Sequence, residues 1–478
     1  MMSKSQASDR PPTALPVQSK EETTRIDRLF QNQLDILVIL LVFAVSRILY
    51  YAVGVRFDTS SLPYFYQFLD VVWLKDDLLR SLWHLHSQPP LYNLMLGIGL
   101  KLFPDSPGPF WWGCSIAMGA AMSLMMQRSM VYLGVGRWLA TVIALIYVVS
   151  PHTILYENWL FYTYPVTFLL IASVYFLARF LSRFTRTSGF LFFLTCCALI
   201  LTRSAFHPLW LIASAFILLE WFPRKSKSIG IVFLIPFLLA VGWYGKNAVM
   251  FGKFSGSTWL GMSLAKGTIF RLPDEEREKW IEEGALSDIS EIYPFGPIVV
   301  YEGIVPEHDP TGVPALDEPW KSNHKVNFNH LSFIEISDRY LEDSLKTIRR
   351  DPVGYGETLV RAFLLFFRPP SEMSFLDGNR EKIETWNAFF TRWVTLQILP
   401  FEKATKLDRE GGFPISFLVC CYFWMILFPL TLLYALRKAL SYWGGNETER
   451  RKGVLLCFLV FNILYISLIG NALEYGEN

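Results

Sequence analysis

The sequence predicts an all-α protein that crosses a membrane many times. Hydrophobic residues make up 52% of the chain and charged residues only 18%, whereas a typical soluble domain carries about 25% charged residues. The mean hydropathy is +0.31, and apolar runs recur along most of the 478 residues. A soluble protein of this composition would have to expose a largely apolar surface, so we expect a bundle of about nine to ten transmembrane helices.

Residues 1–33 form a segment of their own. They are rich in Ser, Pro, Gln and charge, and they show no apolar periodicity, which is typical of disorder. No short apolar core with a small-residue cleavage site occurs here. We therefore expect a disordered cytoplasmic tail and not a cleaved signal.

The apolar runs begin at residue 34. A helix that crosses a bilayer needs about 20 apolar residues, and three of the runs (90–104, 137–151 and 188–202) are short by that standard. We expect these three to be tilted, buried in the bundle or only partly crossing. The ten runs are 34–54, 90–104, 109–132, 137–151, 159–181, 188–202, 206–222, 229–245, 413–436 and 453–472.

Basic residues near the ends of the runs predict the orientation of the chain. Basic loops at 179–186, 224–227 and 437–452 are expected in the cytoplasm, which places the segment 247–412 and the loop 151–158 outside. The loop around Asp58 shares that outer side only if one apolar run does not cross. The run 90–104 is the first candidate for this exception, and the pair within 188–222 is the second.

The composition divides the rest of the chain into three parts. A transmembrane module at 34–246 contains a first extracytoplasmic loop at 54–89. Between 247 and 412, Pro, Gly, Asp and Glu become frequent, and the one apolar stretch, 358–367, is weak. A loop this long is rarely structureless, so we expect a partly helical extracytoplasmic domain on the bundle. Within it we predict a helix at 331–350 and an amphipathic interfacial helix at 379–404. The segment 413–478 holds the C-terminal transmembrane helices.

The first loop carries the residues that are most informative about function. Asp58 is a solitary acid directly after the first apolar run, and an amphipathic stretch at 64–85 follows it. The segment His86-Ser87-Gln88-Pro89-Pro90-Leu91-Tyr92 then leads back into apolar sequence. Acids and imidazoles at the rim of a membrane span usually have a function there.

This order of elements resembles the GT-C superfamily of lipid-linked glycosyltransferases. It is similar to the transferases that use polyprenyl-phosphate sugars, which include protein O-mannosyltransferases and the aminoarabinose transferases of lipid A. Those families carry a catalytic Asp, often as Asp-Glu, in the first extracytoplasmic loop, and a motif like His-x-Pro-Pro-Leu opens the next helix. Here the second motif has one extra residue, and Thr59 stands in place of the second acid. The resemblance implies a GT-C-like bundle with a first loop of amphipathic helices and a larger late loop.

Three acids are candidates for catalysis. Transfer of a sugar to a hydroxyl needs a base, and a partly desolvated carboxylate at the bilayer rim suits that task. We expect Asp58 to be this base, and the alternative is that it caps the following helix. Asp70 is a candidate second acid unless it pairs locally or faces solvent. Glu157 is another, unless it is a polar residue of an aromatic belt that includes Tyr162, itself a candidate substrate contact.

Several polar side chains are candidates for binding the substrate. His86 and Gln88, before a rigid Pro-Pro turn, are expected to contact the sugar or the phosphate, and the alternative is that they cap the next helix. Arg203 interrupts an apolar stretch, and a cation there needs an anion. A lipid phosphate would serve, and the alternatives are snorkelling or a salt bridge to Asp58 or Glu157. Further candidates for the substrate site are His207, Lys246 and Lys266.

No metal or cofactor is expected. His324 and His330 lie in the most polar stretch of the late loop but are too isolated from acids to predict a metal site. The six cysteines lie in apolar runs without metal spacing, so we expect buried thiols. The transferases that the chain resembles generally work without a metal.

These observations predict an inverting glycosyltransferase with a polyprenyl-phosphate sugar donor and a glycan, lipid or protein acceptor. The bilayer is its environment, a bacterial inner membrane is the expected location, and no nucleic acid partner is expected. A lipid-linked saccharide flippase or transporter and an inactive scaffold are the alternatives. The chain stops soon after its last apolar run, where similar transferases continue, so the resemblance implies a truncated copy.

Overall fold

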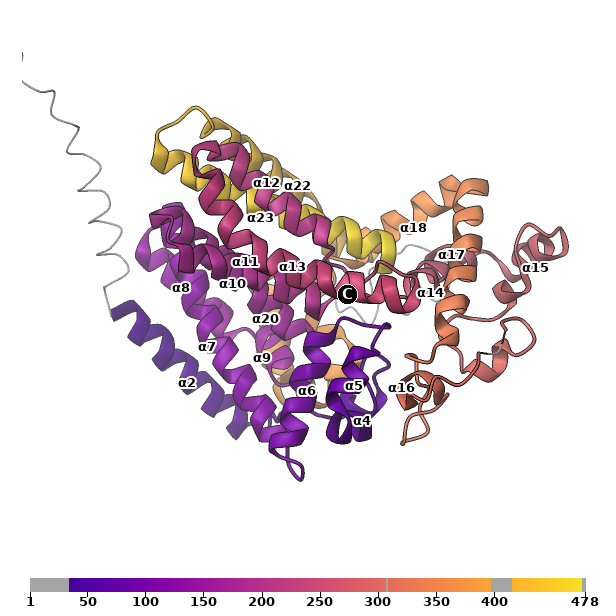
Figure 1. The fold of residues 1–478 in the computed structure, drawn as a ribbon. Helices are drawn as coiled ribbons and strands as arrows, with labels where there is room; N and C mark the ends of the chain where they lie inside the picture. Colours follow the sequence, from indigo (N-terminus) through magenta and orange to yellow (C-terminus); the bar gives the residue numbers. More distant parts are fainter. Residues whose placement is uncertain (1–33, 307, 397–414, 475–478) are drawn as a thin grey trace, which may run out of the picture.

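The computed structural model describes residues 34–306, 308–396 and 415–474, and this part of the chain is helical without a named strand. The helices of the N-terminal half pack side by side, and residues 260–365 form a group at one end of them, whereas residues 384–393 pack back against residues 151–157 of the bundle (Figure 1). Those of the N-terminal half are α2 (Leu34–Ala52), α3 (Ser61–Tyr64), α4 (Val71–Asp76), α5 (Leu78–Trp83), α6 (Pro90–Leu102), α7 (Gly108–Leu133), α8 (Arg137–Val149), α9 (Pro151–Glu157), α10 (Thr163–Arg183), α11 (Arg186–Thr202), α12 (Pro208–Trp221), η1 (Pro223–Lys225) and α13 (Ser226–Phe251).

The late segment is built from short helices with one longer pair. Its elements are α14 (Leu260–Gly267), η2 (Ile269–Arg271), α15 (Asp274–Glu282), η3 (Asp288–Glu291), η4 (Ile298–Tyr301), α16 (Pro314–Asp317), α17 (Ser332–Arg350), α18 (Pro352–Leu365), η5 (Pro370–Glu372), η6 (Ser374–Leu376), α19 (Asp377–Arg380), η7 (Glu381–Ile383) and α20 (Glu384–Trp393). Two long helices, α22 (Ile415–Ser441) and α23 (Glu447–Glu474), follow.

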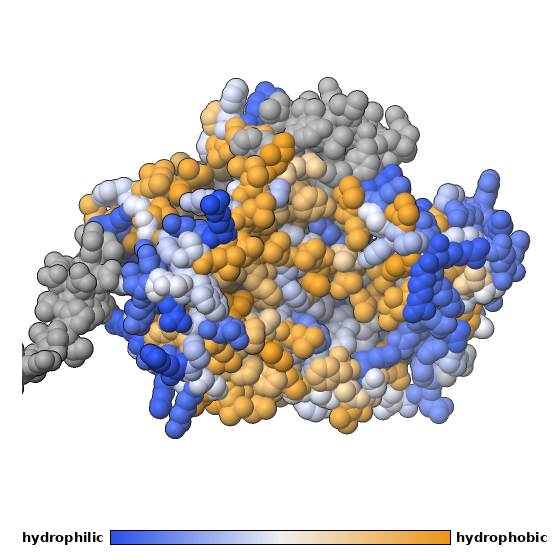
Figure 2. Space-filling view, turned by 90° about the horizontal axis from the view of Figure 1, so that it is seen from above, coloured by the Kyte–Doolittle hydropathy of each residue, from blue (hydrophilic) through white to orange (hydrophobic). Residues whose placement is uncertain are grey.

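The apolar composition is concentrated in helices long enough to cross a membrane. Within the described residues, five helices meet that requirement by length and composition, or six if α8 and α9, bent by 55° at their break, form one span. Apolar side chains cover much of the bundle surface, while hydrophilic ones gather over the late segment (Figure 2). The chain is therefore a multi-pass membrane protein. The five helices lie at Leu34–Ala52, Thr163–Arg183, Pro223–Phe251, Trp424–Ser441 and Glu447–Leu473.

The bundle has two distinct ends. At the first, here called the basic end, the side chains of Arg450 and Arg451 donate hydrogen bonds to the carbonyls of Trp221 and Ser182. The three basic loops therefore meet at this end, as the orientation predicted from the sequence requires.

The second end, here called the loop end, brings the first loop to the loop after α9. The Asp58 N–H donates to the Asn158 carbonyl at 2.8 Å, and the Leu160 N–H donates to the Asp58 carbonyl at 2.9 Å. The late segment lies at this end too, because the Lys321 ammonium donates to the Phe68 carbonyl at 2.6 Å. The first loop, the loop 151–158 and the late segment thus share one side of the molecule.

The position of helix α6 explains how the first loop, the loop 151–158 and the late segment come to lie on one side of the molecule. The helix starts at Pro90, beside the first loop, and is 13 residues long, which is about 20 Å and too short for a bilayer core of about 30 Å. Trp112, in the first turn of α7, stacks at 6.3 Å on Tyr51 from the last turn of α2. Since Tyr51 lies at the loop end, α6 begins and ends there. The run 90–104 is our first candidate for a run that does not cross, and this position of its two ends is the one expected of such a run.

Two predictions for the late segment differ in outcome. The helix expected at 331–350 is present as α17. The single interfacial helix expected at 379–404 is instead broken into α19, η7 and α20, and 397–404 lies outside the described residues. Helix α20 is still amphipathic: Phe390 is buried, while Phe389 and Trp393 are 50% and 65% exposed.

Candidate functional site

Asp58 lies where the first loop crosses the segment after α9. Its backbone is fixed on both sides by Asn158 and Leu160, so the position of the carboxylate is set by two loops that are distant in sequence. The side chain is half-buried, and Oδ1 accepts the Ser60 N–H at 2.8 Å. This contact is of the capping kind that we gave as the alternative. No described residue forms an ion pair with Asp58, so no cation of the described residues binds its second carboxylate oxygen.

Glu157 takes up a different position. Its carboxylate is fully buried and accepts two hydrogen bonds from Arg47, at 2.9 and 2.6 Å, and one from the Tyr164 hydroxyl at 2.7 Å. The bidentate pair compensates two charges that would otherwise be costly inside the bundle. The expected role of Glu157 as a second acid beside Asp58 therefore has no support in the geometry, because both of its oxygens are committed to α2 and α10.

Asp70 is also committed to structural contacts. It caps α4 by accepting the Val72 N–H at 2.9 Å, and it accepts hydrogen bonds from both the N–H and the hydroxyl of Ser322. Only 3% of the residue is exposed, so it does not face solvent. Asp70 joins the first loop to the late segment, and the geometry gives no support to the prediction that it is a second catalytic acid.

His86 is part of the same junction. Its Nε2 lies 3.0 Å from the Asn329 carbonyl, and its Nδ1 lies 2.9 Å from the Thr258 hydroxyl. Because a carbonyl can only accept, Nε2 carries the proton and Nδ1 accepts from Thr258. Burial lowers the pKa of His86 to about 3, with smaller contributions from Lys246 and His330. The ring is therefore neutral and holds the late segment in place. Gln88, two residues on, is half-buried.

Lys246 is the most unusual cation at the loop end. It lies in the last turns of α13, is 8% exposed, and donates to the Leu85 carbonyl at 2.9 Å. Its ammonium lies 3.9 Å from the centre of the Trp243 ring. Among the described residues, no acid forms an ion pair with it. A buried ammonium without a carboxylate is costly unless an anion binds beside it.

Arg203 lies at the C-terminal cap of α11, also at the loop end. Its guanidinium lies 5.6 Å from the centre of the Tyr162 ring, and that ring contacts Tyr92 edge-on at 6.0 Å. The Tyr92 hydroxyl is buried and has no hydrogen-bond partner in the described structure. Arg203 and Tyr162 are thus brought together as candidate substrate contacts, and Tyr92 is a residue that the sequence analysis missed.

The remaining two candidates lie elsewhere. His207 caps α12 by accepting the Leu209 N–H at 3.2 Å, which matches an ordinary helix-end histidine. Lys266 is in α14, with its ammonium 5.1 Å from the centre of the Phe295 ring inside the late segment. Neither is placed by a described contact beside Asp58 or Lys246.

Arg47 and Lys321 are two further residues that the sequence analysis missed. Arg47 interrupts the first apolar run, and an intramembrane cation of this kind is a signal that predicts a buried acid partner. Lys321 is 5% exposed and donates to the carbonyls of Phe65 and Phe68 at 3.1 and 2.6 Å. Burial lowers its pKa to about 8, partly offset by Asp70. No sequence pattern marks it, because its partners are backbone carbonyls.

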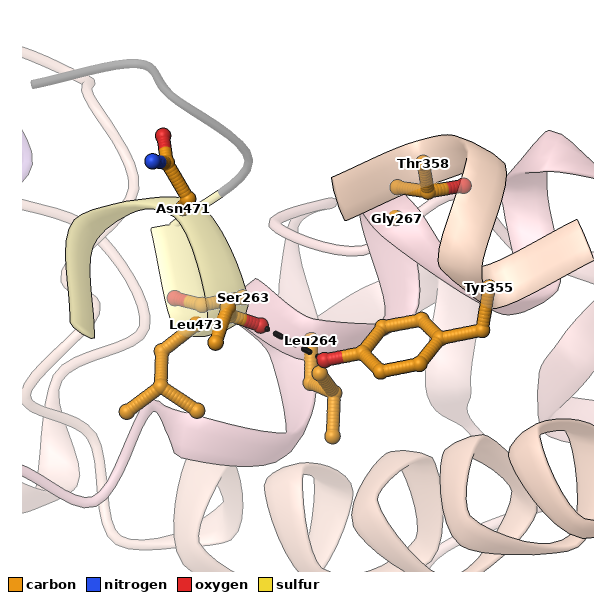
Figure 3. A pocket seen from close by; sticks show the side chains of 8 residues that line it. Ser263, Leu264, Gly267, Tyr355, Thr358, Asn471 and Leu473 are labelled. Atoms are coloured by element: carbon orange, nitrogen blue, oxygen red, sulfur yellow. Dashed lines mark hydrogen bonds between the residues drawn. The ribbon is translucent and has the colours of Figure 1, made fainter. Parts of the chain in front are cut away.

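A small pocket lies at α14, the helix of Lys266, and none of the residues discussed above lines it. Its lining comes from α14, α18 and α23, and the Tyr355 hydroxyl donates to the Ala472 carbonyl at 3.0 Å across it (Figure 3). It contains hydroxyl and amide groups but no acid or cation, so it offers no base or phosphate contact. Within the described residues, no group of His, Cys, Asp and Glu has the arrangement of a metal site.

Comparison of the chain with protein-family models, with curated proteins and with solved structures finds no match. The function is therefore argued from the residues of the loop end alone.

Proposed function

We propose that the protein is a membrane glycosyltransferase that moves a sugar from a polyprenyl-phosphate donor to an acceptor hydroxyl, with Asp58 as the base. The observation that carries this proposal is the state of the acids at the loop end. Glu157 and Asp70 are held in buried networks. Asp58 is half-buried, fixed through its backbone, and keeps a carboxylate oxygen that no described cation binds.

The cations at the loop end support a phosphate-bearing substrate. Lys246 is buried without an acid partner in the described structure, and Arg203 lies beside the rings of Tyr162 and Tyr92. A lipid phosphate would supply the negative charge that Lys246 lacks. The prenyl chain would then extend along the apolar surface of the bundle, which is where a lipid-linked donor resides.

The chemistry follows from these positions. Asp58 accepts the proton of the acceptor hydroxyl as its oxygen attacks the anomeric carbon from the face opposite the phosphate. The bond between that carbon and the phosphate oxygen breaks, and its electron pair leaves with the lipid phosphate. Lys246 and Arg203 would stabilise the charge that develops on this leaving group. Attack from the opposite face inverts the configuration of the sugar.

The proposal also includes the number of times that the chain crosses the membrane. If α7, α11, α12 and the bent pair α8–α9 cross the membrane together with the five helices that are long and apolar enough, while α6 turns back, the described part of the chain has nine spans. That number agrees with the GT-C-like bundle expected from the first-loop motifs. With nine spans, Asp58, Lys246 and Arg203 would all lie on the same outer side of the membrane.

The test compares Asp58→Asn with Asp76→Asn, an exposed acid of the same loop. Membranes that contain each variant are incubated with polyprenyl-phosphate sugars that carry the radiolabel on the sugar. Transfer is measured as the radiolabel that leaves the lipid donor and is recovered in other products. We expect Asp58→Asn to lower transfer by about 10²–10⁴-fold and Asp76→Asn to leave it unchanged.

Three outcomes would contradict the proposal. Wild-type turnover by Asp58→Asn would remove the assigned base. Movement of the labelled lipid between leaflets without covalent transfer would identify a flippase, and binding of the lipid phosphate with neither activity would identify a scaffold.

A further inference from the structure

A second charged cluster lies at the basic end, far from the proposed transferase site, between three helices that pack together (Figure 1). Asp35, in the first turn of α2, is fully buried. Its carboxylate contacts Arg128 of α7 at 2.9 Å and Arg137 of α8 at 3.2 Å, and it accepts a hydrogen bond from Gln127 at 2.9 Å. Among the described residues, this one carboxylate therefore faces two guanidinium groups.

Arg137 shares the Asp35 carboxylate with Arg128, and a third cation lies at the same turn. Nη2 of Arg137 is buried and has no acceptor in the described structure. Lys452, in the first turns of α23, has its ammonium 3.2 Å from the position that a Cβ would take at Gly134, three residues before Arg137. Among the described residues, Lys452 forms no ion pair. Both cations thus flank the turn that joins α7 to α8.

The acids of this end do not compensate these charges. Glu447 pairs with Arg451 at 2.6 Å, and Glu449 accepts the Asn446 N–H at 3.0 Å. Over the segments 179–186, 220–227 and 437–452 the chain carries eleven basic and three acidic residues. Basic residues therefore outnumber acidic ones in these three segments.

Beside this cluster lies a surface that suits lipid chains. Helices α2 and α8 pack against each other, and their outer faces are apolar and exposed. On α8 the ring of Trp138 is 56% exposed and lies 5.6 Å from the Arg137 guanidinium. The exposed apolar residues next to the cluster are Leu34, Leu37 and Leu41 of α2 and Leu139, Val142 and Ile143 of α8.

We propose that this place is a binding site for an anionic phospholipid. The phosphate of the headgroup lies between Arg137 and Lys452 at the α7–α8 turn, and the acyl chains follow the exposed faces of α2 and α8. Charge complementarity selects an anionic lipid over a zwitterionic one, because Arg137 Nη2 and Lys452 have no described acidic partner and a net negative headgroup would supply one. This site does not depend on the proposed transferase activity.

The experiment is native mass spectrometry of the full chain titrated with phosphatidylglycerol or with phosphatidylcholine of the same acyl chains. The variants are Arg137→Gln and Lys452→Gln, and Lys227→Gln is the control because it removes an exposed cation at the same end. We expect wild type to prefer phosphatidylglycerol, and each test variant to lose about fivefold in its affinity, which corresponds to roughly 1 kcal/mol per cation. The control should keep wild-type affinity, and inorganic phosphate should not displace the lipid.

Three results would overturn the site: equal affinity for both lipids, an equal loss in Lys227→Gln, or displacement by inorganic phosphate at millimolar concentration. Arg137→Gln also weakens the buried network around Asp35. If Arg137→Gln does not fold, the result for Lys452→Gln alone decides whether the site exists. The N-terminal segment carries the acidic residues Asp9, Glu21, Glu22 and Asp27, and their removal tests whether this segment binds the cations in place of a lipid. A fourfold substitution, D9N/E21Q/E22Q/D27N, that raises the affinity for phosphatidylglycerol would assign the cations to that segment instead.

Discussion

At the scale of single residues, the surroundings separate acids that the sequence leaves equivalent. Asp58 and Glu157 lie near the ends of apolar runs and Asp70 lies in the amphipathic stretch between two runs, and each has a carboxylate of similar intrinsic acidity. The fold supplies Glu157 with Arg47 and supplies Asp70 with Ser322. Asp58 receives a single backbone N–H. Partners that are more than 100 residues away in the chain thus determine which acid remains available as a base.

His86 gives a prediction about pH at this scale. Its pKa is lowered to about 3 in the folded protein, against about 6.5 when exposed. The unfolded chain therefore binds the proton first as the pH falls, so the stabilisation by neutral His86 is complete above pH 6.5 and is lost progressively below it. We expect His86→Gln, which does not titrate, to make the melting temperature less dependent on pH between 6.5 and 4.5.

The measurement is thermal unfolding in detergent across that pH range. His84→Gln serves as the control, because His84 is in the same loop and is only partly buried. Parallel curves for wild type and His86→Gln would show that His86 does not contribute to the pH dependence.

At the scale of elements, α6 determines the topology of the chain. An apolar run of this length is compatible with either a short span or a buried helix, and its sequence does not distinguish the two. In the structure, Gly97 approaches Leu78 of α5 so closely that a Cβ would lie 2.3 Å from it, and Gly99 meets Trp111 of α7 in the same way. Two glycines thus let α6 lie against neighbours at the loop end.

This topology predicts the labelling of the turn between α6 and α7. In a background without native cysteines, Asp105→Cys should react with a membrane-impermeant maleimide from the same side as Tyr64→Cys, whose parent residue is 63% exposed. Lys227→Cys, at the basic end, should react only from the opposite side. Labelling of Asp105→Cys together with Lys227→Cys would mean that α6 crosses the membrane.

At the scale of the whole molecule, the late segment holds the first loop in place. Lys321, Ser322 and Asn323 are consecutive, and they bind Phe65, Phe68, Asp70 and Pro63 of the first loop. Asn329 adds hydrogen bonds to the backbone of His86 and Ser87. The loop that carries Asp58 is therefore stabilised by residues more than 240 positions later.

We predict that Lys321→Met loosens the first loop without unfolding the bundle. Two buried carbonyls lose their donor, at about 1–3 kcal/mol each, so amide hydrogen exchange within 63–70 should accelerate by at least about fivefold. Hydrogen exchange with mass spectrometry measures this, and Lys325→Met is the matched control because Lys325 is exposed on the same turn. Acceleration spread equally over the bundle would mean that Lys321 supports global stability and not this junction.

The sequence by itself determined the class of the molecule. Composition and apolar runs are sufficient for a multi-pass helical membrane protein, because span length and backbone hydrogen bonding in lipid leave few alternatives. The basic loops at 179–186, 224–227 and 437–452 were sufficient to group one set of helix ends, since charge near a span is a local property.

Only the tertiary structure showed that both ends of α6 lie at the loop end, that Glu157 and Asp70 are bound by other residues of the protein, and that Lys246 and Lys321 are buried. Each of these depends on a partner far along the chain, and a local pattern contains no information about such a partner. The packing of the helices determines which ion-pair partners and backbone acceptors each side chain meets. A carboxylate or ammonium at one position is therefore bound by the protein, while one at another position stays available for a substrate.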